Sequence, residues 1–363
     1  MSVEFWTMGA GSLQTPEQLR SGMQQAPLTG TQQAVRAEEI GYDGIVYVDN
    51  QNRWGDCYVT LALAAHATSH IQLGTGVTNS YTRHPIVTAA AIATVQAESG
   101  GRVHMGIGRG DSALANLGLA PHAVGPFERY LEQLQAYLRG DEVPFEAGDV
   151  ETLGLSDRPV ASRIAWIGSV KPKVPVDVAA TGPRVIAAAA RHADRVSLNV
   201  GADVSRTRWA MEVARTARDE AGLSPEIPFA AYLPLVVHDD PREATRIGAG
   251  NTSLFARFST MHGKVVGPAT AHQQAVFEAI HAAYDMHHHS VPGSAQEAVV
   301  TAEFEHEFGI FGPPNYCVER LSQLIELGID RFILRGSPLD PDDPDSASCE
   351  RFVQDVVPQL RTL

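Results

Sequence analysis

The stretch that decides the fold is Gly74–Ser112, GTGVTNSYTRHPIVTAAAIATVQAESGGRVHMGIGRGDS. It joins the end of one apolar run, Ile71–Gly76, to a second, Val103–Gly108, through a segment with helical periodicity. Pro85 suits the first turn of that helix, and Gly100-Gly101 suits its end. Two strands joined by a helix pair in parallel through a right-handed crossover. The stretch therefore predicts one strand–helix–strand unit of an α/β fold.

The same alternation continues on both sides of this stretch along the 363 residues. Strands that alternate with helices pair in parallel, and eight such units predict a closed (β/α)8 barrel, a TIM barrel, in one domain over residues 1–363. An open, doubly wound sheet is the rival arrangement. The eight predicted strands are Val3–Met8, Gly44–Val48, Ile71–Gly76, Val103–Gly108, Val174–Ala179, Arg195–Val200, Phe229–Val237 and Arg331–Leu334.

Two connections are longer than a barrel needs. The insertion after the fourth strand runs from about Asp111 to Val170 and contains a helical pattern at Pro126–Leu138. The insertion after the seventh strand runs from His238 to Asp330, with an excursion at about 238–305. Long connections inside a compact domain are usually functional or carry helices of their own. We therefore expect both insertions to cover the active end of the barrel.

Composition argues against several kinds of partner. A net charge of −14 gives no basic surface for nucleic acid or an anionic membrane. Three widely separated cysteines indicate a reducing compartment without a disulfide framework. No signal-peptide pattern and no bilayer-spanning apolar window occur, so we expect a cytoplasmic protein. His287-His288-His289 lacks acidic or cysteine partners at ligand spacing, so a surface loop or part of a substrate lid is favoured over a metal site.

In a barrel of this kind, functional residues collect in the loops that follow the strands. The second strand is followed by Asp49-Asn50-Gln51-Asn52-Arg53-Trp54. This segment fits a capped turn, and it fits equally a polar cluster facing a ligand, with Trp54 as a stacking wall. We expect Trp6, in the first strand, and Tyr81, after the third, to line the same pocket.

The loops after the third and fourth strands are rich in glycine. Gly76-Val77-Thr78-Asn79 offers hydrogen-bond donors beside a helix start, where His84 is favoured as a cap over a catalytic residue. Gly106-Ile107-Gly108-Arg109-Gly110 has the GxGxG form of a dinucleotide loop but follows the wrong strand for one. Close approach of the backbone to a planar cofactor is the better interpretation of these glycines. Asp111 follows directly.

The loops after the fifth and sixth strands are neighbours in the predicted barrel. Thr181-Gly182 precedes a proline at a helix start, where free N–H groups and the helix dipole favour a phosphate. Asn199-Val200-Gly201 forms the adjacent loop. Both segments also fit ordinary strand-to-helix turns, which the residues alone favour.

Several of these segments resemble the bacterial luciferase-like flavin superfamily. The resemblance covers Tyr42–Asp49, Gly74–Ser112, Pro175–Gly201 and Ile325–Leu334, and it is vague across 238–305. The form VTN-x-YTRHP at 77–85 is most similar to the branch of methylenetetrahydromethanopterin reductase and its F420-dependent relatives. The resemblance implies a barrel of this kind, usually dimeric, with a deazaflavin or isoalloxazine ring in its C-terminal mouth.

The resemblance also implies roles for individual residues. A non-proline cis peptide falls at Gly76-Val77, where the bulged backbone would brace the ring. The His that sugar-phosphate dehydrogenases of this family carry is replaced by Asn50, and a basic phosphate contact is replaced by Ala202, so a sugar-phosphate substrate is not expected. Ring contacts fall at Asp49, Gly76, Val77 and Asn79, phosphate contacts at Gly182 and Asn199–Gly201, and a substrate-side carboxylate at Asp111.

Three functions fit these residues. The first is an F420-dependent oxidoreductase that transfers a hydride between the deazaflavin and a small organic substrate, with Asp49, Asn50 and Asp111 as catalytic residues and Asp111 as the leading general acid or base. The second is an FMN-dependent monooxygenase that uses O₂ and reduced flavin from a partner reductase. The third is a non-catalytic flavin-binding protein. The predicted cofactor-binding residues are Gly76, Val77, Thr78, Asn79, Gly108, Arg109, Thr181, Gly182, Asn199, Val200 and Gly201.

Overall fold

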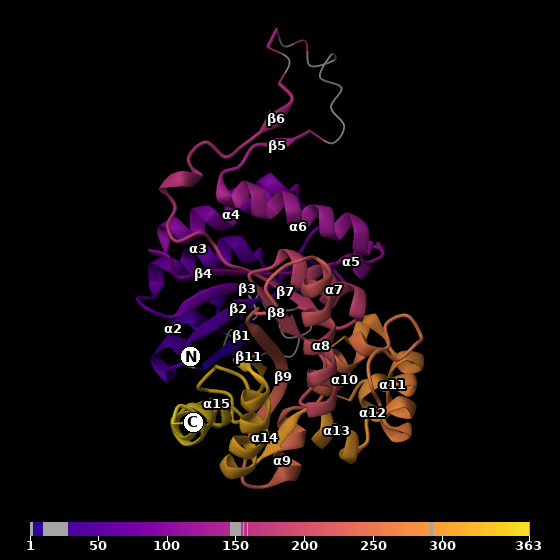
Figure 1. Ribbon diagram of the computed structural model, residues 1–363. Coiled ribbons are helices and arrows are strands. Elements are labelled where there is room, and N and C mark those ends of the chain that lie inside the picture. Colours follow the sequence, from indigo (N-terminus) through magenta and orange to yellow (C-terminus); the bar gives the residue numbers. More distant parts are fainter. Residues whose placement is uncertain are drawn as a thin grey trace.

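Eight parallel strands form a closed barrel in the computed structural model, which describes residues 3–9, 28–145, 154, 156–157, 159–289 and 293–362 (Figure 1). The strands follow one another in chain order, and β9 pairs with both β8 and β11, which closes the circle. The barrel prediction is therefore confirmed, and the open sheet is wrong because no edge of the barrel is left free. The barrel strands are β1 (Glu4–Gly9), β2 (Gly44–Tyr47), β3 (Gln72–Asn79), β4 (Val103–Gly108), β7 (Val176–Ala180), β8 (Arg195–Leu198), β9 (Phe229–Val237) and β11 (Ile329–Arg335).

Helices cover the outside of the barrel, and their ends carry the expected caps. Thr29 and Gln32 form a capping box at the start of α2 (Gly30–Ile40). Asp56 accepts hydrogen bonds from two backbone N–H groups of α3 (Cys57–Ala67). His84 accepts from the N–H of Ile86, which confirms it as a cap. No described helix is long and apolar enough to cross a membrane. The outer helices are α2 (Gly30–Ile40), α3 (Cys57–Ala67), α4 (Pro85–Glu98), α6 (Val124–Arg139), α7 (Pro183–His192), α8 (Val204–Glu220), α14 (Pro314–Leu327), α15 (Ala347–Arg351) and α16 (Val357–Leu360).

Among the described residues of the insertion after β4, those of its first part lie at the barrel mouth. The short helix α5 (Ser112–Ala115) begins beside the mouth, and Ser112, Ala113 and Pro121 line the cavity there. The later part forms a hairpin of β5 (Val143–Pro144) and β6 (Ala161–Ser162) that projects away from the barrel beyond α6 (Figure 1). Residues 146–153, 155 and 158 of this insertion lie outside the described residues.

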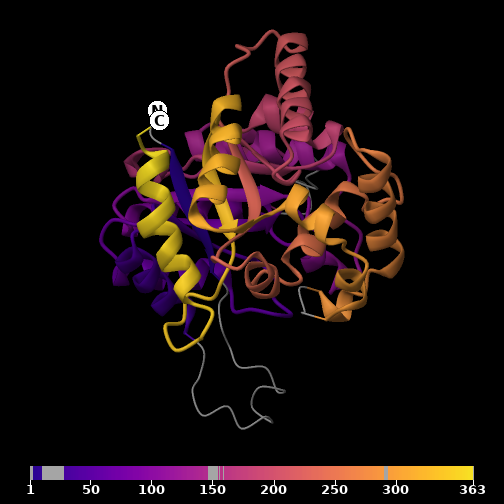
Figure 2. The ribbon, with the colours of Figure 1, turned by 90° about the horizontal axis from the view of Figure 1, so that it is seen from below.

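The insertion after β9 forms a group of helices at one side of the barrel, drawn in orange in Figures 1 and 2. Phe255, Phe277 and Phe304 from these helices join one apolar cluster with Tyr232 and Val46 from inside the barrel. The insertion therefore packs on the barrel mouth, as expected. The sequence did not predict its short strand, β10, which pairs with the end of β9. The elements are α9 (Pro241–Ile247), α10 (Asn251–Ala256), α11 (Ala271–Ala283), α12 (Ala295–Ala298), α13 (Ala302–Phe308) and β10 (Ile310–Gly312).

A buried charged group fills the opposite end of the barrel. Arg331 donates hydrogen bonds to Glu4 Oε2 and Asp177 Oδ2, each at 2.7 Å. Its guanidinium lies 4.4 Å above the ring of Trp6, and the edge of His104 contacts the same ring. Side chains near the start of four strands thus close the floor, so the space inside the barrel opens at the C-terminal end of the strands.

Strand β3 carries a bulge that explains why the neighbouring strand has a glycine at position 106. Thr75 lies opposite Met105, but Thr78 lies opposite Ile107, so β3 has one residue more than β4 over this interval. The peptide between Gly76 and Val77 within the bulge is cis, as the resemblance implied. A Cβ on Gly106 would lie 2.1 Å from the carbonyl oxygen of Thr75. Gly106 therefore makes room for the neighbouring strand, which corrects the expectation that it approaches a cofactor.

We predict that Gly106→Ala destabilises the protein. A clash with backbone leaves no flexible side chain to move aside, so the cost is about 3 kcal/mol. For a chain of this length that lowers the melting temperature by about 4 °C. Gly125→Ala is the matched control, because a Cβ there meets nothing closer than 3.8 Å and the residue lies in α6. It should keep or raise the melting temperature. Equal melting temperatures for both variants in a thermal scan would contradict the tight packing of the bulge.

Candidate active site

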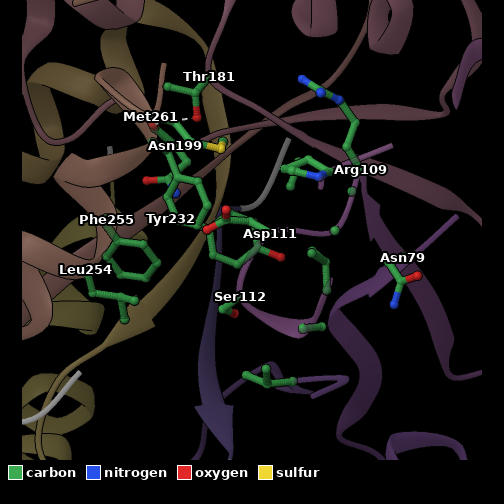
Figure 3. A pocket seen from close by; sticks show the side chains of 18 of the residues that line it. Asn79, Arg109, Asp111, Ser112, Thr181, Asn199, Tyr232, Leu254, Phe255 and Met261 are labelled. Atoms are coloured by element: carbon green, nitrogen blue, oxygen red, sulfur yellow. Dashed lines mark hydrogen bonds between the residues drawn. The ribbon is translucent and has the colours of Figure 1, made fainter. Parts of the chain in front are cut away.

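A cavity of about 370 Å³ opens at the C-terminal ends of the strands. In the view of Figure 3, Asp111 lies near its centre, with Tyr232 and Phe255 on one side and Asn79 on the other. Most barrel strands and the insertion after β9 contribute to its wall. The lining residues used below are Asp49, Asn50, Arg53, Trp54, Gly76, Val77, Thr78, Asn79, Gly108, Arg109, Asp111, Thr181, Gly182, Asn199, Tyr232, Phe255, His262, Lys264, His289 and Arg335.

The bulge of β3 forms one wall of the cavity. Gly76 and Val77 line the space directly, beside Asn79 at the end of the strand. The Asn79 side chain is 2% exposed, and its Oδ1 accepts from the N–H groups of Tyr81 and Thr82 at 3.0 Å. These bonds fix the amide so that Nδ2 is the free end, and Nδ2 has no hydrogen-bond partner among the described residues. A buried donor without a partner is costly, so this wall is built for a ligand that accepts a hydrogen bond.

The first turn of α7 forms another wall. Gly182 is the N-cap and offers no side chain, so the first N–H groups of the helix are not capped by a side chain. The hydroxyl of Thr181 donates to the carbonyl of Asn199 at 3.1 Å, which ties the two neighbouring loops together. Asn199 is 7% exposed, and its Oδ1 lacks a partner among the described residues. Pro183 has no N–H and the N–H of Val185 donates to the Gly182 carbonyl at 3.0 Å, which leaves the N–H of Arg184 open at the helix start. This N–H and the helix dipole, beside an unsatisfied amide, suit a phosphate and its ester chain.

Asp49 and Asn50 lie buried at the end of β2. Asp49 accepts a hydrogen bond from the hydroxyl of Thr78 at 2.6 Å. Burial raises the pKa of Asp49, and the Thr78 hydrogen bond opposes this shift. The Asn50 Oδ1 accepts from the amide of Asn116 at 3.3 Å. The polar segment after β2 therefore faces the cavity, as one of its two interpretations required, and it places a carboxyl group and an amide there.

Asp111 is held by an arginine from the insertion after β9. The guanidinium of Arg257 donates to both carboxylate oxygens, one of them at 3.0 Å, and lies 4.4 Å above the ring of Tyr284. Burial raises the pKa of Asp111, and the charge of Arg257 opposes this shift. The pair joins the start of α5 to a segment almost 150 residues later. It places an oriented carboxyl group in the centre of the cavity.

Arg53 holds the segment 286–289 over the cavity. Its guanidinium donates to the carbonyl groups of Met286, His287 and His289, the last at 2.7 Å. His289 is buried, and the hydroxyl of Tyr284 lies 2.6 Å from its Nδ1. Burial and the nearby arginines lower the pKa of His289 to about 3, so this ring is neutral. His287 and His288 are exposed, and no cluster able to hold a metal ion occurs among the described residues.

Four of the residues predicted for the site lie outside the cavity wall. Trp6 is buried below the cavity, where it stacks with Arg331 in the barrel floor. Tyr81 is half exposed and packs against the edge of His122. Val200 points into the core between strands and helices. Gly201 packs so closely on Phe308 that a Cβ would clash with that ring. The other predicted residues line the cavity.

The sequence interpretation missed residues of two kinds. Arg335 ends β11, and the rule that function follows each strand would have found it if applied to the last strand. Arg257, Phe255 and Lys264 come from the insertion after β9, where the resemblance is vague. No periodicity marks them, because their placement depends on how distant helices pack on the mouth.

Comparison with known proteins assigns the chain to a family. It is 30% identical over 346 residues to the 5,10-methylenetetrahydromethanopterin reductase of Methanopyrus kandleri, covering 90% of this chain and 93% of the relative. Among solved structures, the coenzyme F420-dependent tetrahydromethanopterin reductase of that organism superposes with a TM-score of 0.71 at 24% identity, covering 99% of this chain and all of that one. The oxygenating constituent of 3,6-diketocamphane monooxygenase from Pseudomonas putida, in complex with FMN, gives 0.65 at 17% identity, with 99% of each chain covered. These two likenesses show the fold.

The family model for luciferase-like monooxygenases matches residues 8–331, which include every barrel strand apart from the start of β1 and the end of β11. The chain therefore belongs to the luciferase-like monooxygenase family.

Proposed function

We propose that this protein is an F420-dependent oxidoreductase that transfers a hydride between the deazaflavin and a small organic substrate. The observation that carries the proposal is a cavity with a bulged strand as one wall and an uncapped helix start as another. The 30% identity to the reductase of Methanopyrus kandleri, together with the solved reductase of that organism that is described as coenzyme F420-dependent, supports a deazaflavin over a flavin.

We also propose that residues 1–363 form one domain in the cytoplasm. In support, the insertion shares an apolar cluster with the barrel, and all three cysteines are free thiols.

The residues of the cavity fit a ring with a phosphate-bearing side chain. Gly76 and Val77 would support the face of the ring, and the free amide N–H of Asn79 would donate to one of its carbonyl oxygens. The first turn of α7 and the side chain of Asn199 would bind the phosphate and the adjoining hydroxyl groups. When bound, the deazaflavin supplies two-electron hydride chemistry.

The remaining wall would orient the substrate and move its proton. Tyr232, Phe255 and Trp54 exclude water from one side, which strengthens every polar interaction inside the cavity. Asp111, fixed by Arg257, is the proposed general acid or base: its carboxylate would take the proton of a substrate hydroxyl or amine as the hydride leaves, and return it in the reverse reaction. Asp49 is the second carboxyl group within the cavity, and Asn50 would hydrogen-bond the substrate.

An FMN-dependent monooxygenase, supplied with reduced flavin by a partner reductase, is the second candidate. The FMN-bound monooxygenase among the similar solved structures supports this second candidate.

We predict that the purified protein binds F420 at micromolar concentration or tighter and binds FMN at least about tenfold more weakly, a difference of about 1.4 kcal/mol. Quenching of cofactor fluorescence measures both affinities. Tight FMN binding together with substrate-dependent O₂ uptake, and no F420 binding, would replace the first candidate by the second.

We predict that Asp111→Asn lowers turnover by about a hundredfold or more while the affinity for F420 changes little, because proton transfer is lost and the ring contacts remain. Turnover is measured as the loss of F420 fluorescence when oxidised cofactor is mixed with small alcohols or amines. In the reverse direction it is measured as the return of fluorescence when reduced cofactor is mixed with ketones or imines. Asp219→Asn, on the exposed side of α8, is the control. If Asp111→Asn keeps the full rate on a substrate that the native protein turns over, Asp111 is not the acid or base. If the native protein binds cofactor and turns over nothing, it is the non-catalytic binding protein.

We also propose a homodimer formed through α3 and α4. Val59 and Leu63 lie one turn apart on α3 and are 60% and 57% exposed, and Val87 on the adjacent α4 is 52% exposed. Exposed apolar residues gathered on two packed helices mark an interaction surface. A second copy fits because a twofold interface pairs the same patch with itself.

We predict that the double variant Val59→Asp, Leu63→Asp is a folded monomer, because four carboxylates would then meet in the buried interface. Light scattering after gel filtration gives the mass. Leu223→Asp, an exposed apolar residue away from the patch, is the control and should remain dimeric. A native protein of monomeric mass would contradict the proposed assembly.

A further inference from the structure

The charged residues that line the cavity are mainly basic, whereas the whole chain is acidic. The chain carries a net charge of −14, yet four lining residues are Arg or Lys and two are acidic. One of the acidic residues, Asp111, is already paired with Arg257, which adds a further positive charge behind the wall. Arg53 and Arg335 lie with His289 on the substrate side. The other two basic residues, Arg109 and Lys264, lie elsewhere on the wall and have no role in the chemistry proposed above.

Arg109 is oriented away from the centre of the cavity. Its Nε donates to the carbonyl of His122, and its own carbonyl accepts from the N–H of the same residue at 2.9 Å. Figure 3 shows its guanidinium pointing away from Asp111. The bond from Nε gives the guanidinium a neutral partner, and the second bond joins the two backbones. The positive charge of Arg109 therefore remains uncompensated by any direct ion pair among the described residues.

Arg184 and Lys264 extend this positive region to the rim. Arg184 lies in the first turn of α7, between Gly182 and Val185, which both line the cavity. Burial lowers the pKa of Arg109, and the positive charge of Arg184 lowers it further, as expected for neighbouring guanidinium groups. Lys264 lines the cavity from the insertion after β9. Both are exposed, and neither forms an ion pair among the described residues.

A buried amide and an open helix start lie beside this rim. Asn199 is more than nine-tenths buried, lines the cavity next to the start of α7, and has an Oδ1 atom without a partner in the described part of the chain. The space above Gly182 is open, since a Cβ there would meet no atom within 4 Å. One phosphate at the helix start would need no more than the open N–H of Arg184 and the helix dipole. Three further cations around it indicate a ligand with additional negative charge.

We propose that Arg109, Arg184 and Lys264 form an anion-binding rim for the part of the cofactor that extends beyond its phosphate. The proposal rests on the proposed function and gives this chain its own means of telling cofactors apart. Coenzyme F420 continues from its phosphate into a tail that carries glutamate carboxylates, whereas FMN ends at the phosphate. Arginine and lysine at the rim would attract those carboxylates from solution and hold them outside the cavity. The rim would therefore favour long-tailed F420 over short-tailed F420, and either over FMN.

The test compares cofactors that share the ring and differ in charge. Affinities are measured by fluorescence for F420 with two and with six glutamates, for the tail-free deazaflavin riboside, and for FMN, at low and at high salt. We expect the six-glutamate form to bind several-fold more tightly than the two-glutamate form at low salt. We expect this preference to shrink at high salt, because exposed ion pairs are screened within a Debye length of about 3 Å at 1 M.

The variants Arg184→Gln and Lys264→Gln should remove most of the preference for the longer tail and leave the affinity for the riboside unchanged. Arg215→Gln is the matched control, since Arg215 is an exposed arginine further along α8. Binding of F420 with an affinity independent of tail length, salt and Arg184 would overturn the rim and leave the proposed function intact. Binding of FMN without binding of any F420 form would overturn both.

Discussion

The contact between the bulged strand β3 and the glycines of β4 determines the geometry on which the site depends. The extra residue in β3 turns the carbonyl of Thr75 towards Gly106, where a side chain would lie within 2.1 Å. The same bulge turns Gly76 and Val77 towards the cavity. Because the hydroxyl of Thr75 donates to the Gly106 carbonyl at 2.6 Å, the bulge is locked to the neighbouring strand. The wall against which a ring can rest is therefore made of backbone that cannot relax.

The opposite wall is held by charge. Asp111 follows β4 directly, but its direction is set by Arg257, which comes from the insertion after β9 and is itself held against Tyr284. Removing either partner would leave a buried charge uncompensated, which costs more than the pair contributes. Tyr284 also contacts His289, and Arg53 binds the carbonyl of His289, so the insertion is tied to two separate strand ends. The substrate side of the cavity therefore forms when the insertion docks.

One wall of the cavity depends on local backbone and the other on how the insertion after β9 packs. This difference explains how much of the molecule could be predicted from the sequence. The strands and the helices α4 and α6 were found because periodicity is a local property, and Asp49, Asn79 and Gly182 were found because they lie at or after strand ends. Trp6 points inward, but the pattern does not show how deep a residue lies along the barrel axis. Val200 follows Asn199, and successive side chains along extended backbone point to opposite sides, so Val200 points outward to the helices. The alternation of side chains could therefore have excluded Val200 from the predicted site. Arg257 and Lys264 had no local signal.

The cofactor side of the cavity is therefore easier to predict from the sequence than the substrate side. Residues that would hold the ring and phosphate belong to β3, α7 and the end of β8, within segments whose sequence resembles a known family. The substrate side also needs the insertion after β9, which supplies Phe255 and His289 to the wall and Arg257 to hold Asp111. A family can keep the first set while the insertion changes, because the bulge and the helix start do not depend on it. The proposed ring and phosphate contacts therefore come from the barrel, and the insertion adds Lys264 to the proposed rim and one wall to the substrate side.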